Sequence, residues 1–297
     1  MIATVIGSNG YLGKHLCAFL MEKGWSVFGY DTSDFPIGQI SKYQSIDISK
    51  KPQIDKIDIK VDFIFYLSGL TGTLTGYDQY ENFIDINEKG LLHLLDLIRW
   101  SKSEARIIFP STRLVYKGVI NKPLDENAEK EFKTIYALNK WFGEQVIQQY
   151  NKYFNVKFNI FRICVPFGNL YSNEYSFGTV GAFIKKASST ENIILYGKGD
   201  QKRTFTHVED ICIQIYNAIL HPQSENSILN INGETFSISE VANLIAKKYG
   251  TLVEYREWPD LDLKIESGDT IFNSTKIQTL IQKPLLHSIN KWILNLK

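Results

Sequence analysis

A tyrosine and a lysine stand four residues apart in the stretch 134–140, a spacing that could support acid–base chemistry. Residues 141–147 continue a helical apolar pattern, and side chains four apart on a helix share one face, so Tyr136 and Lys140 can share a site. A cation beside a phenol favours the phenolate and lowers the tyrosine pKa toward neutrality, which suits a group that exchanges protons at physiological pH. The same spacing also occurs where a half-buried aromatic lies beside a solvated lysine. The rest of the sequence must therefore distinguish a catalytic pair from this structural one.

Length and composition indicate an ordinary globular protein. The 297 residues leave room for one large domain or two modest ones, and the hydrophobic and charged fractions are 44% and 22%. Thirty-three basic residues balance 32 acidic ones without a dense basic patch, which argues against nucleic-acid binding. Residues 1–6 lack a basic region and a cleavage site, and no apolar run reaches the roughly 18 residues that span a bilayer. We therefore expect a cytoplasmic protein with no membrane partner.

The cysteines and histidines do not indicate a disulfide framework or a metal site. Cys17, Cys164 and Cys212 are widely spaced, with no C-x-x-C, which fits a reducing cytosol. Three of the histidines, at positions 15, 93 and 221, offer no metal-ligand spacing. We expect no metal.

A glycine-rich turn follows the first apolar run. Residues 2–6 are typical of a buried parallel strand, and apolar residues recur at helical spacing after the turn. In this context Gly7 permits a tight turn, Gly10 lets a pyrophosphate approach the backbone, and Gly13 lets the helix pack closely on the strand. The helix N-terminus offers free N–H groups to the anion. The spacing G-x-x-G-x-x-G therefore predicts a dinucleotide site.

An acidic residue follows the second expected strand. Residues 25–30 end at Asp31, and a carboxylate about 20–25 residues after the first glycine suits the hydroxyls of an adenosine ribose. It would repel a 2′-phosphate, so NAD is favoured over NADP. The alternative is an aspartate that caps a helix on a surface loop.

The rest of the first half alternates strands with helices. Strands are expected at 43–48, 63–67, 106–109 and 156–160, and helices at 50–60, at 80–100 and around Tyr136. This alternation predicts a doubly wound parallel sheet with right-handed crossovers, whose ligands bind at the carboxyl ends of the strands. Thr112, just beyond a strand, is either a hydrogen-bonding group for a substrate or a turn residue. Asn87, within the helix 80–100, is either buried with partners or functional.

Taken together, these motifs resemble the extended short-chain dehydrogenase/reductases of the nucleotide-sugar epimerase/dehydratase type. The resemblance continues through residues 161–168, similar to the segment that closes over the nicotinamide, and 197–210, similar to the nucleotide-diphosphate segment. It covers nearly the whole chain. It implies a Rossmann-type NAD-binding domain at 1–165 and a smaller C-terminal α/β substrate-binding domain at 166–297, with about 205–232 returning to the first.

The resemblance also implies roles for individual residues. Tyr136 would exchange the proton of a sugar hydroxyl, Lys140 would lower the tyrosine pKa and bind the nicotinamide ribose, and Thr112 would hydrogen-bond the reacting oxygen. The positions implied for NAD binding are Gly7, Asn9, Gly10, Tyr11, Leu12, Gly13, Asp31, Asp47, Ile48, Leu67, Ser68, Gly69, Asn87, Ser111, Tyr136, Lys140 and Cys164. Those implied for the substrate are Thr71, Thr112, Tyr136, Arg203 and Lys264, with the loop 170–177 lining the sugar pocket.

Departures from the family pattern narrow the expected reaction. The dehydratases carry an Asp-Glu pair where this chain has Arg113 and Leu114, and the decarboxylating relatives need a glutamate in the same strand end. The residues typical of galactose epimerases are absent at Thr71 and Val165. The resemblance implies an NAD-dependent nucleotide-sugar 4-epimerase for a UDP-hexose-like substrate. The alternatives are an NDP-4-keto-6-deoxyhexose reductase that uses NAD(P)H, or a non-catalytic NAD-binding protein.

A homodimer is a further implication of the resemblance. Family members commonly dimerise through the helix after Asn87 and the Tyr136 helix, whose apolar residues core burial explains equally well.

Overall fold

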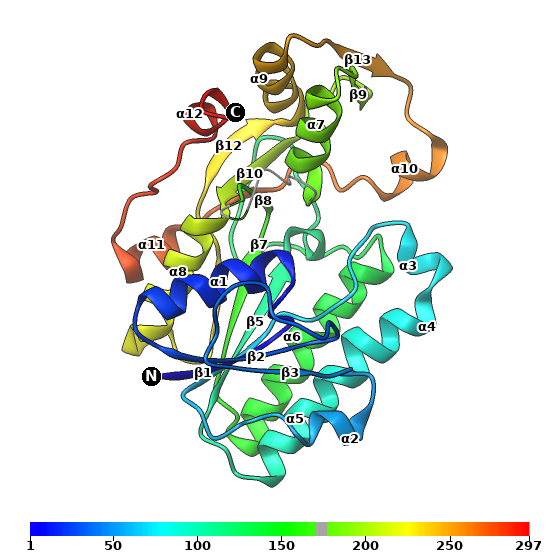
Figure 1. The fold of residues 1–297 in the computed structure, drawn as a ribbon. Helices are drawn as coiled ribbons and strands as arrows, with labels where there is room; N and C mark the ends of the chain where they lie inside the picture. Colours follow the sequence, from blue (N-terminus) through cyan, green and yellow to red (C-terminus); the bar gives the residue numbers. More distant parts are fainter. Residues whose placement is uncertain (170, 172–176, 297) are drawn as a thin grey trace. The chain divides into compact units, whose positions relative to one another are not determined.

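The computed structural model describes residues 1–169, 171 and 177–296, and its chain divides into two compact units (Figure 1). The first unit comprises residues 1–115, 134–162 and 219–229, and the second comprises 116–133, 163–218 and 230–297. Two of these bounds differ from the sequence expectation. Residues 116–133 lie in the second unit, because β6 (Pro123–Leu124) pairs with β14 (Ile271–Phe272). Of residues 205–232, only 219–229 lie in the first unit.

A seven-stranded sheet forms the centre of the first unit, in the order β11-β7-β5-β4-β1-β2-β3. In chain order its strands are β1 (Ile2–Ile6), β2 (Ser26–Asp31), β3 (Lys42–Ser45), β4 (Phe63–Tyr66), β5 (Arg106–Thr112), β7 (Phe158–Ile163) and β11 (Ser227–Asn230). β1 pairs in parallel with both β2 and β4, β2 with β3, and β4 with β5. The carboxyl ends of these five strands therefore meet at one edge of the sheet, as the alternating pattern predicts.

Helices cover both faces of this sheet. α1 (Tyr11–Glu22) lies on one face, and α2 (Lys51–Ile54), α5 (Gly90–Trp100) and α6 (Ile135–Phe154) lie on the other (Figure 1). Thr134 starts α6 because its hydroxyl accepts a hydrogen bond from the Ala137 N–H at 3.1 Å, and Asn155 ends it in the left-handed conformation at φ 57°. Short helical turns complete the unit: α3 (Thr75–Asp78), α4 (Tyr80–Phe83), η2 (Arg113–Val115) and η3 (Pro222–Ser224).

The expected helix at 80–100 is interrupted. Between α4 and α5, residues Ile84–Lys89 form the π-helical turn η1, which places one extra residue in the turn. The spacing of apolar residues does not reveal the extra residue, because apolar residues still recur on the inner side of the helix.

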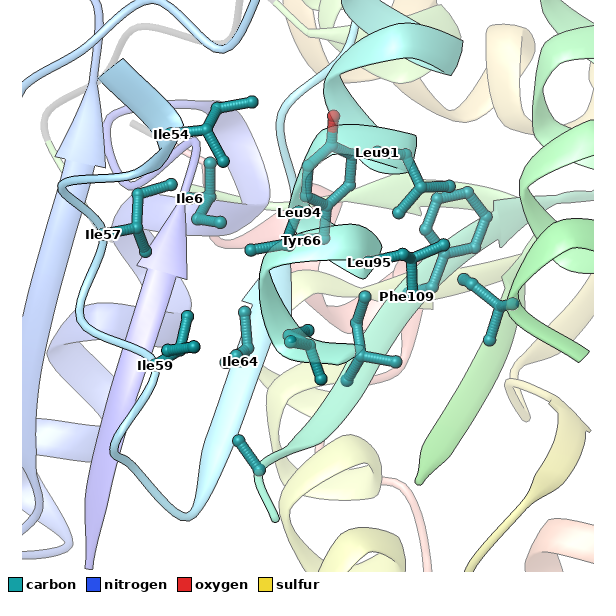
Figure 2. Packing of buried hydrophobic residues seen from close by; sticks show 14 of the residues in the cluster. Ile6, Ile54, Ile57, Ile59, Ile64, Tyr66, Leu91, Leu94, Leu95 and Phe109 are labelled. Atoms are coloured by element: carbon teal, nitrogen blue, oxygen red, sulfur yellow. The ribbon is translucent and has the colours of Figure 1, made fainter. Parts of the chain in front are cut away.

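Isoleucine and leucine side chains from the sheet and from helices α2 and α5 form the core of the first unit (Figure 2). Ile6 and Ile64 from the sheet meet Leu91, Leu94 and Leu95 of α5, and all five are fully buried. This packing fixes the strands whose ends carry the predicted site.

The second unit contains three smaller sheets. The first, in the order β12-β10-β8, has β8 (Val165–Phe167) parallel and β12 (Glu234–Ser237) antiparallel to β10 (Lys202–His207). β9 (Ile193–Tyr196) pairs in parallel with β13 (Val253–Arg256), and β6 with β14. Its helices are α7 (Gly178–Ser188), α8 (Val208–Leu220), which runs into the first unit, α9 (Ile238–Tyr249), α10 (Asp260–Ile265), α11 (Thr275–Ile281) and α12 (Ile289–Leu294).

Among the described residues, no helix is both long enough and apolar enough to cross a membrane.

Candidate active site

A pocket of about 290 Å³ opens at the carboxyl ends of β1, β2 and β4. Eight of the residues predicted to bind the cofactor line it: Gly7, Gly10, Asp31, Asp47, Ile48, Leu67, Ser68 and Gly69. They come from separate parts of the chain, and the parallel sheet brings them together.

The glycine turn fits a diphosphate because side chains have no room there. Gly7 has φ +86°, and a Cβ on it would lie 2.6 Å from the Ser68 nitrogen. A Cβ on Gly13 would lie 2.0 Å from the Gly7 carbonyl oxygen, so the first turn of α1 packs directly on the strand end. Tyr11 and Leu12 stand with Gly13 in the first turn of α1, the end of a helix at which backbone N–H groups point outward. The turn can therefore bring N–H donors up to an anion.

The Asp31 carboxylate is held in place at the pocket wall. Its Oδ2 accepts a hydrogen bond from the Asn9 N–H at 2.9 Å, and its Oδ1 accepts one from the Thr32 N–H at 2.8 Å. The Asn9 side chain is turned to the loop after β2, where its Nδ2 donates to the Phe35 carbonyl at 2.8 Å and its Oδ1 accepts from the Ile37 N–H. Asn9 thus orders the loop with its side chain and orients Asp31 with its backbone.

Asp47 and Ile48 form another part of the pocket wall. Hydrogen bonds from the Ser49 hydroxyl at 2.7 Å and the Ser49 N–H at 3.0 Å lower the pKa of the Asp47 carboxyl, with Lys50 acting in the same direction. The wall therefore carries negative charge beside an apolar isoleucine, which suits an adenosine better than a group with an extra phosphate.

Asn87 is buried and has several partners. Its Oδ1 accepts from the Leu70 N–H at 2.7 Å, its Nδ2 donates to the Leu70 carbonyl at 3.0 Å, and the same Nδ2 reaches Asn139 Oδ1 at 3.3 Å. Asn139 in turn donates to Glu88 at 2.6 Å. The amide therefore holds the segment after β4 that lines the pocket. Asn87 makes these bonds from within the π-helical turn η1.

Thr112, Tyr136 and Lys140 come together at the end of β5 and the start of α6. The Thr112 and Tyr136 side chains share a hydrogen bond. Lys140 Nζ donates to the Pro110 carbonyl at 2.8 Å and lies 6.0 Å from the centroid of the Tyr136 ring. The side chain of Lys140 is buried, with 8% exposed.

The predicted lowering of the Tyr136 pKa is wrong for this structure. Burial of the phenol raises the pKa of Tyr136 to about 12 and outweighs the hydrogen bond with Thr112, which acts in the opposite direction. Burial also lowers the pKa of Lys140 to about 8, against the raising effect of the Glu144 carboxylate. The spacing of Tyr136 and Lys140 reveals the neighbouring charge, whereas the desolvation of both groups depends on the folded structure.

Ser111 makes a different contact from the predicted cofactor bond. Its hydroxyl donates to Glu144 Oε1 at 2.5 Å, and Glu144 forms a fully buried ion pair with Arg162. Sequence reasoning missed Glu144 and Arg162. The signal was available for Glu144, since it follows Lys140 by the same four residues that separate Lys140 from Tyr136.

The residues predicted for the nucleotide lie in the second unit. Arg203 is buried, and its Nη2 lies 2.5 Å from Glu266 Oε1 while its Nη1 donates to the carbonyls of Lys202 and Gly268. Lys264 lies exposed on α10. These contacts engage Nη1 and Nη2 of the Arg203 guanidinium, so a phosphate at Nη2 would compete with Glu266.

The remaining predicted positions are less informative. Cys164 Sγ lies 3.4 Å from the Thr270 carbonyl oxygen within the second unit, and Thr71 is exposed in the first. Of the loop 170–177, residues 170 and 172–176 lie outside the described residues.

A cluster of two histidines and a glutamate in the second unit was not expected. The rings of His207 and His287 are tilted by 30° to each other with centroids 3.9 Å apart, and His287 Nε2 lies 2.7 Å from Glu209 Oε2. His207 Nδ1 accepts from the Glu209 N–H at 3.3 Å. The ligand atoms of these three side chains lie within 4.8 Å of one another, close enough to hold a metal ion. The contact between His287 and Glu209 also joins the segment before α12 to the start of α8.

Comparison with known proteins agrees with this geometry. The chain is 25% identical over 252 residues to a putative UDP-glucose 4-epimerase of Methanocaldococcus jannaschii, which covers 83% of this chain and 82% of the relative. It is 25% identical over 267 residues to the CDP-paratose 2-epimerase of Salmonella typhi, covering 79% and 77%. The crystal structure of the Thermus thermophilus UDP-glucose 4-epimerase in complex with NAD superposes with a TM-score of 0.87 at 18% identity, covering 100% of this chain and 97% of that one.

A sequence model of the NAD dependent epimerase/dehydratase family matches residues 3–232. That span includes the glycine turn, Asp31 and the Tyr136/Lys140 helix. The chain therefore belongs to the NAD dependent epimerase/dehydratase family, and its cofactor is NAD.

Proposed function

We propose that the protein is an NAD-dependent 4-epimerase of a nucleotide sugar, with a UDP-hexose as the default substrate class. The observation that carries this proposal is the hydrogen bond between Thr112 and Tyr136 with Lys140 one helical turn away. A phenol, a hydroxyl and a buried ammonium at one strand end are the groups that proton exchange at a sugar hydroxyl requires.

Bound NAD supplies the acceptor and later the donor of a hydride at C4 of the sugar. Tyr136 would act as the phenolate, a form that burial disfavours and the Thr112 hydrogen bond favours; the phenolate would accept the proton of the C4 hydroxyl as the C4–H bond breaks, and would return it when the C4–H bond forms again on the other face. Thr112 hydrogen-bonds the phenol oxygen and favours its ionised form. Atoms and electrons balance over the cycle, because the hydride and the proton both return to the sugar.

Two acidic side chains that elimination of water would need are not at this strand end. The positions after Thr112 hold Arg113 and Leu114 in the short turn η2. Because Arg113 and Leu114 carry no carboxyl group, these two positions cannot supply the acid–base pair that dehydration needs. This supports epimerisation over the dehydratase reaction of the same family.

The nucleotide moiety would be bound in the second unit. We assign the diphosphate to Arg203, whose planar guanidinium suits two phosphate oxygens, with Lys264 as a single point charge. We include a homodimer through α5 and α6 in the proposal, supported by the apolar side chains that these helices expose: Trp100, Leu138, Tyr153 and Phe154.

The proposal is tested with a C4-deuterated sugar. We expect the purified protein to convert one of the UDP-, dTDP-, GDP- or CDP-hexoses to its 4-epimer, with the deuterium retained, as followed by NMR and mass spectrometry. Tyr136→Phe should abolish turnover and leave NAD bound. Tyr150→Phe is the matched control on the same helix, because the Tyr150 hydroxyl bonds Asp96 at 2.7 Å instead.

Three outcomes would overturn the assignment. Full activity of Tyr136→Phe would remove its acid–base role. Loss of the deuterium to solvent would exclude hydride return. Net consumption of NADPH with a 4-keto sugar would make the protein a reductase, and acid denaturation of the purified protein would then release no stoichiometric NAD.

A further inference from the structure

Glu144 continues the line of the two predicted catalytic residues along α6. Tyr136, Lys140 and Glu144 follow one another at intervals of four residues, so their side chains lie along one side of the helix. The side chain of Glu144 is 0% exposed. A carboxylate at such a depth is costly unless it is paired and hydrogen-bonded.

The partners of Glu144 come from two neighbouring strands. Arg162 of β7 makes a bidentate ion pair, with Nε 2.9 Å from Oε1 and Nη2 2.6 Å from Oε2, and Arg162 is itself only 1% exposed. Ser111 of β5 donates to Oε1 at 2.5 Å. One carboxylate therefore fixes α6 to both strands.

Lys140 also bonds to strand β5, at Pro110, one residue before Ser111. Its Nζ donates to the Pro110 carbonyl at 2.8 Å, so Pro110 and Ser111 are each bonded to α6. The next residue along the strand is Thr112, the partner of Tyr136. The register between Thr112 and Tyr136 thus depends on these two bonds.

The buried ammonium of Lys140 has few charged neighbours. Among the described contacts, α6 supplies Tyr136 and Glu144, and Arg162 of β7 lies behind Glu144. β5 supplies neutral groups around Lys140 Nζ, the Pro110 carbonyl and the Phe109 ring with its centroid at 4.6 Å. Glu88 of η1 is reached only through Asn139. Glu144 is therefore the anion that favours the charged form of Lys140.

We propose that Glu144 is a positioning residue for the reaction: its carboxylate is the counter-charge of Lys140 and, through Ser111, sets Thr112 opposite Tyr136. The reaction itself rests on the function proposed above. The two tasks of Glu144 are separable, since Glu144→Gln removes the charge but keeps an acceptor oxygen, whereas Ser111→Ala keeps the charge but removes the bond to β5.

The first measurement is the protonation of Lys140, independent of turnover. Lysines labelled with ¹³C at Cε are titrated by NMR with and without NAD, and the Lys140 signal is assigned by its loss in Lys140→Arg. We expect a midpoint near 8 without NAD in the wild type, a lower midpoint in Glu144→Gln, and the wild-type midpoint in Ser111→Ala. Glu225→Gln is the matched control, because it removes a carboxylate from the ion pair with Arg106, 2.7 Å long, in the same unit.

The second measurement is the pH profile of kcat and KM for the nucleotide sugar. The limb that belongs to Lys140 should move to lower pH in Glu144→Gln and stay in place in Ser111→Ala. Ser111→Ala should instead lower kcat by about 100-fold at all pH values, the effect of a small misplacement of reacting groups. Glu225→Gln should match the wild type in both respects.

An unchanged Lys140 midpoint in Glu144→Gln would refute the role of Glu144 as the counter-charge of Lys140. An unchanged kcat in Ser111→Ala would refute the claim that the bond from Ser111 to Glu144 positions Thr112. If Glu144→Gln does not fold, the double variant Glu144→Gln/Arg162→Gln replaces the ion pair with two neutral amides, and the same NMR titration decides. An active Tyr136→Phe would refute the proposed function while leaving the titration result intact, so the two failures are distinguishable.

Discussion

Each of the two units buries one arginine almost completely, but the two arginines are paired differently. Arg162 is 1% exposed and faces Glu144, which is 0% exposed. Arg203 is 2% exposed and faces Glu266, which is 22% exposed. The first pair is sealed within the core between α6 and β7, whereas the partner in the second pair retains access to water.

This difference indicates two uses of the same ion pair. A sealed pair cannot exchange its partner, because separating the charges leaves one of them buried and unpaired. A carboxylate that still reaches water can leave and be hydrated, so another anion can take its place at the arginine. The first unit therefore uses its arginine for fixed geometry, and the second unit uses its arginine where an anionic ligand could bind.

The largest expected effect comes from breaking the sealed pair. Arg162→Leu leaves the Glu144 carboxylate buried without its partner, and we expect the free energy of unfolding to fall by about 3–5 kcal/mol, as measured by urea denaturation. Glu225→Gln breaks the more exposed pair with Arg106 and should cost about 1 kcal/mol or less. Equal losses in the two variants would show that burial does not distinguish these pairs.

A pH-dependent effect of similar size is expected at Lys140, beside the sealed pair. Its pKa is about 8 in the folded protein and 10.5 in an unfolded lysine, so the unfolded chain binds more protons between these values. The contribution of Lys140 to stability therefore rises as pH increases from 8 to 10.5. Lys140→Met has no group that titrates at this position, so only the wild type should gain this stability. Relative to Lys140→Met, the wild type should therefore become more stable by on the order of 3 kcal/mol between pH 8 and 10.5.

Urea denaturation of both proteins at pH 8, 9 and 10 measures this difference. Tyr136 titrates above this window and is present in both proteins, so its contribution cancels to first order. A stability difference that is independent of pH would mean that Lys140 is solvated in the folded protein.

The smallest expected effect concerns the open pair in the second unit. Glu266→Gln removes the anion that competes for Arg203, so we expect several-fold tighter binding of UDP by isothermal titration calorimetry. Glu257→Gln, an exposed carboxylate in the same unit, is the control and should leave the affinity unchanged. Weaker binding by Glu266→Gln would instead make Glu266 a support that orients Arg203 toward the ligand.

Much of the cofactor pocket could be predicted because its determinants are local. Gly7, Gly10 and Gly13 act through the backbone of a single turn, and Asp31 stands at the end of the next strand, so spacing alone identifies them. The alternation of strands and helices along the chain was sufficient to predict the parallel sheet.

The remaining features depend on contacts between distant residues. Glu266 meets Arg203 across 63 positions of sequence, and the pairing of β6 with β14 moves residues 116–133 into the second unit. The pKa of Tyr136 depends on how deeply the folded chain buries the phenol, which sequence spacing does not reveal. Only Glu144 carried an overlooked local signal, its interval of four residues from Lys140.

The π-helical turn η1 makes the site sensitive to chain length as well as to residue type. Asn87 reaches both backbone groups of Leu70 from within this turn. Removal of one residue from it would restore regular α-helix and rotate everything on one side by about 100° relative to the other. An in-frame deletion of a single codon at 84–86 would keep every remaining side chain and still turn the amide away from the pocket.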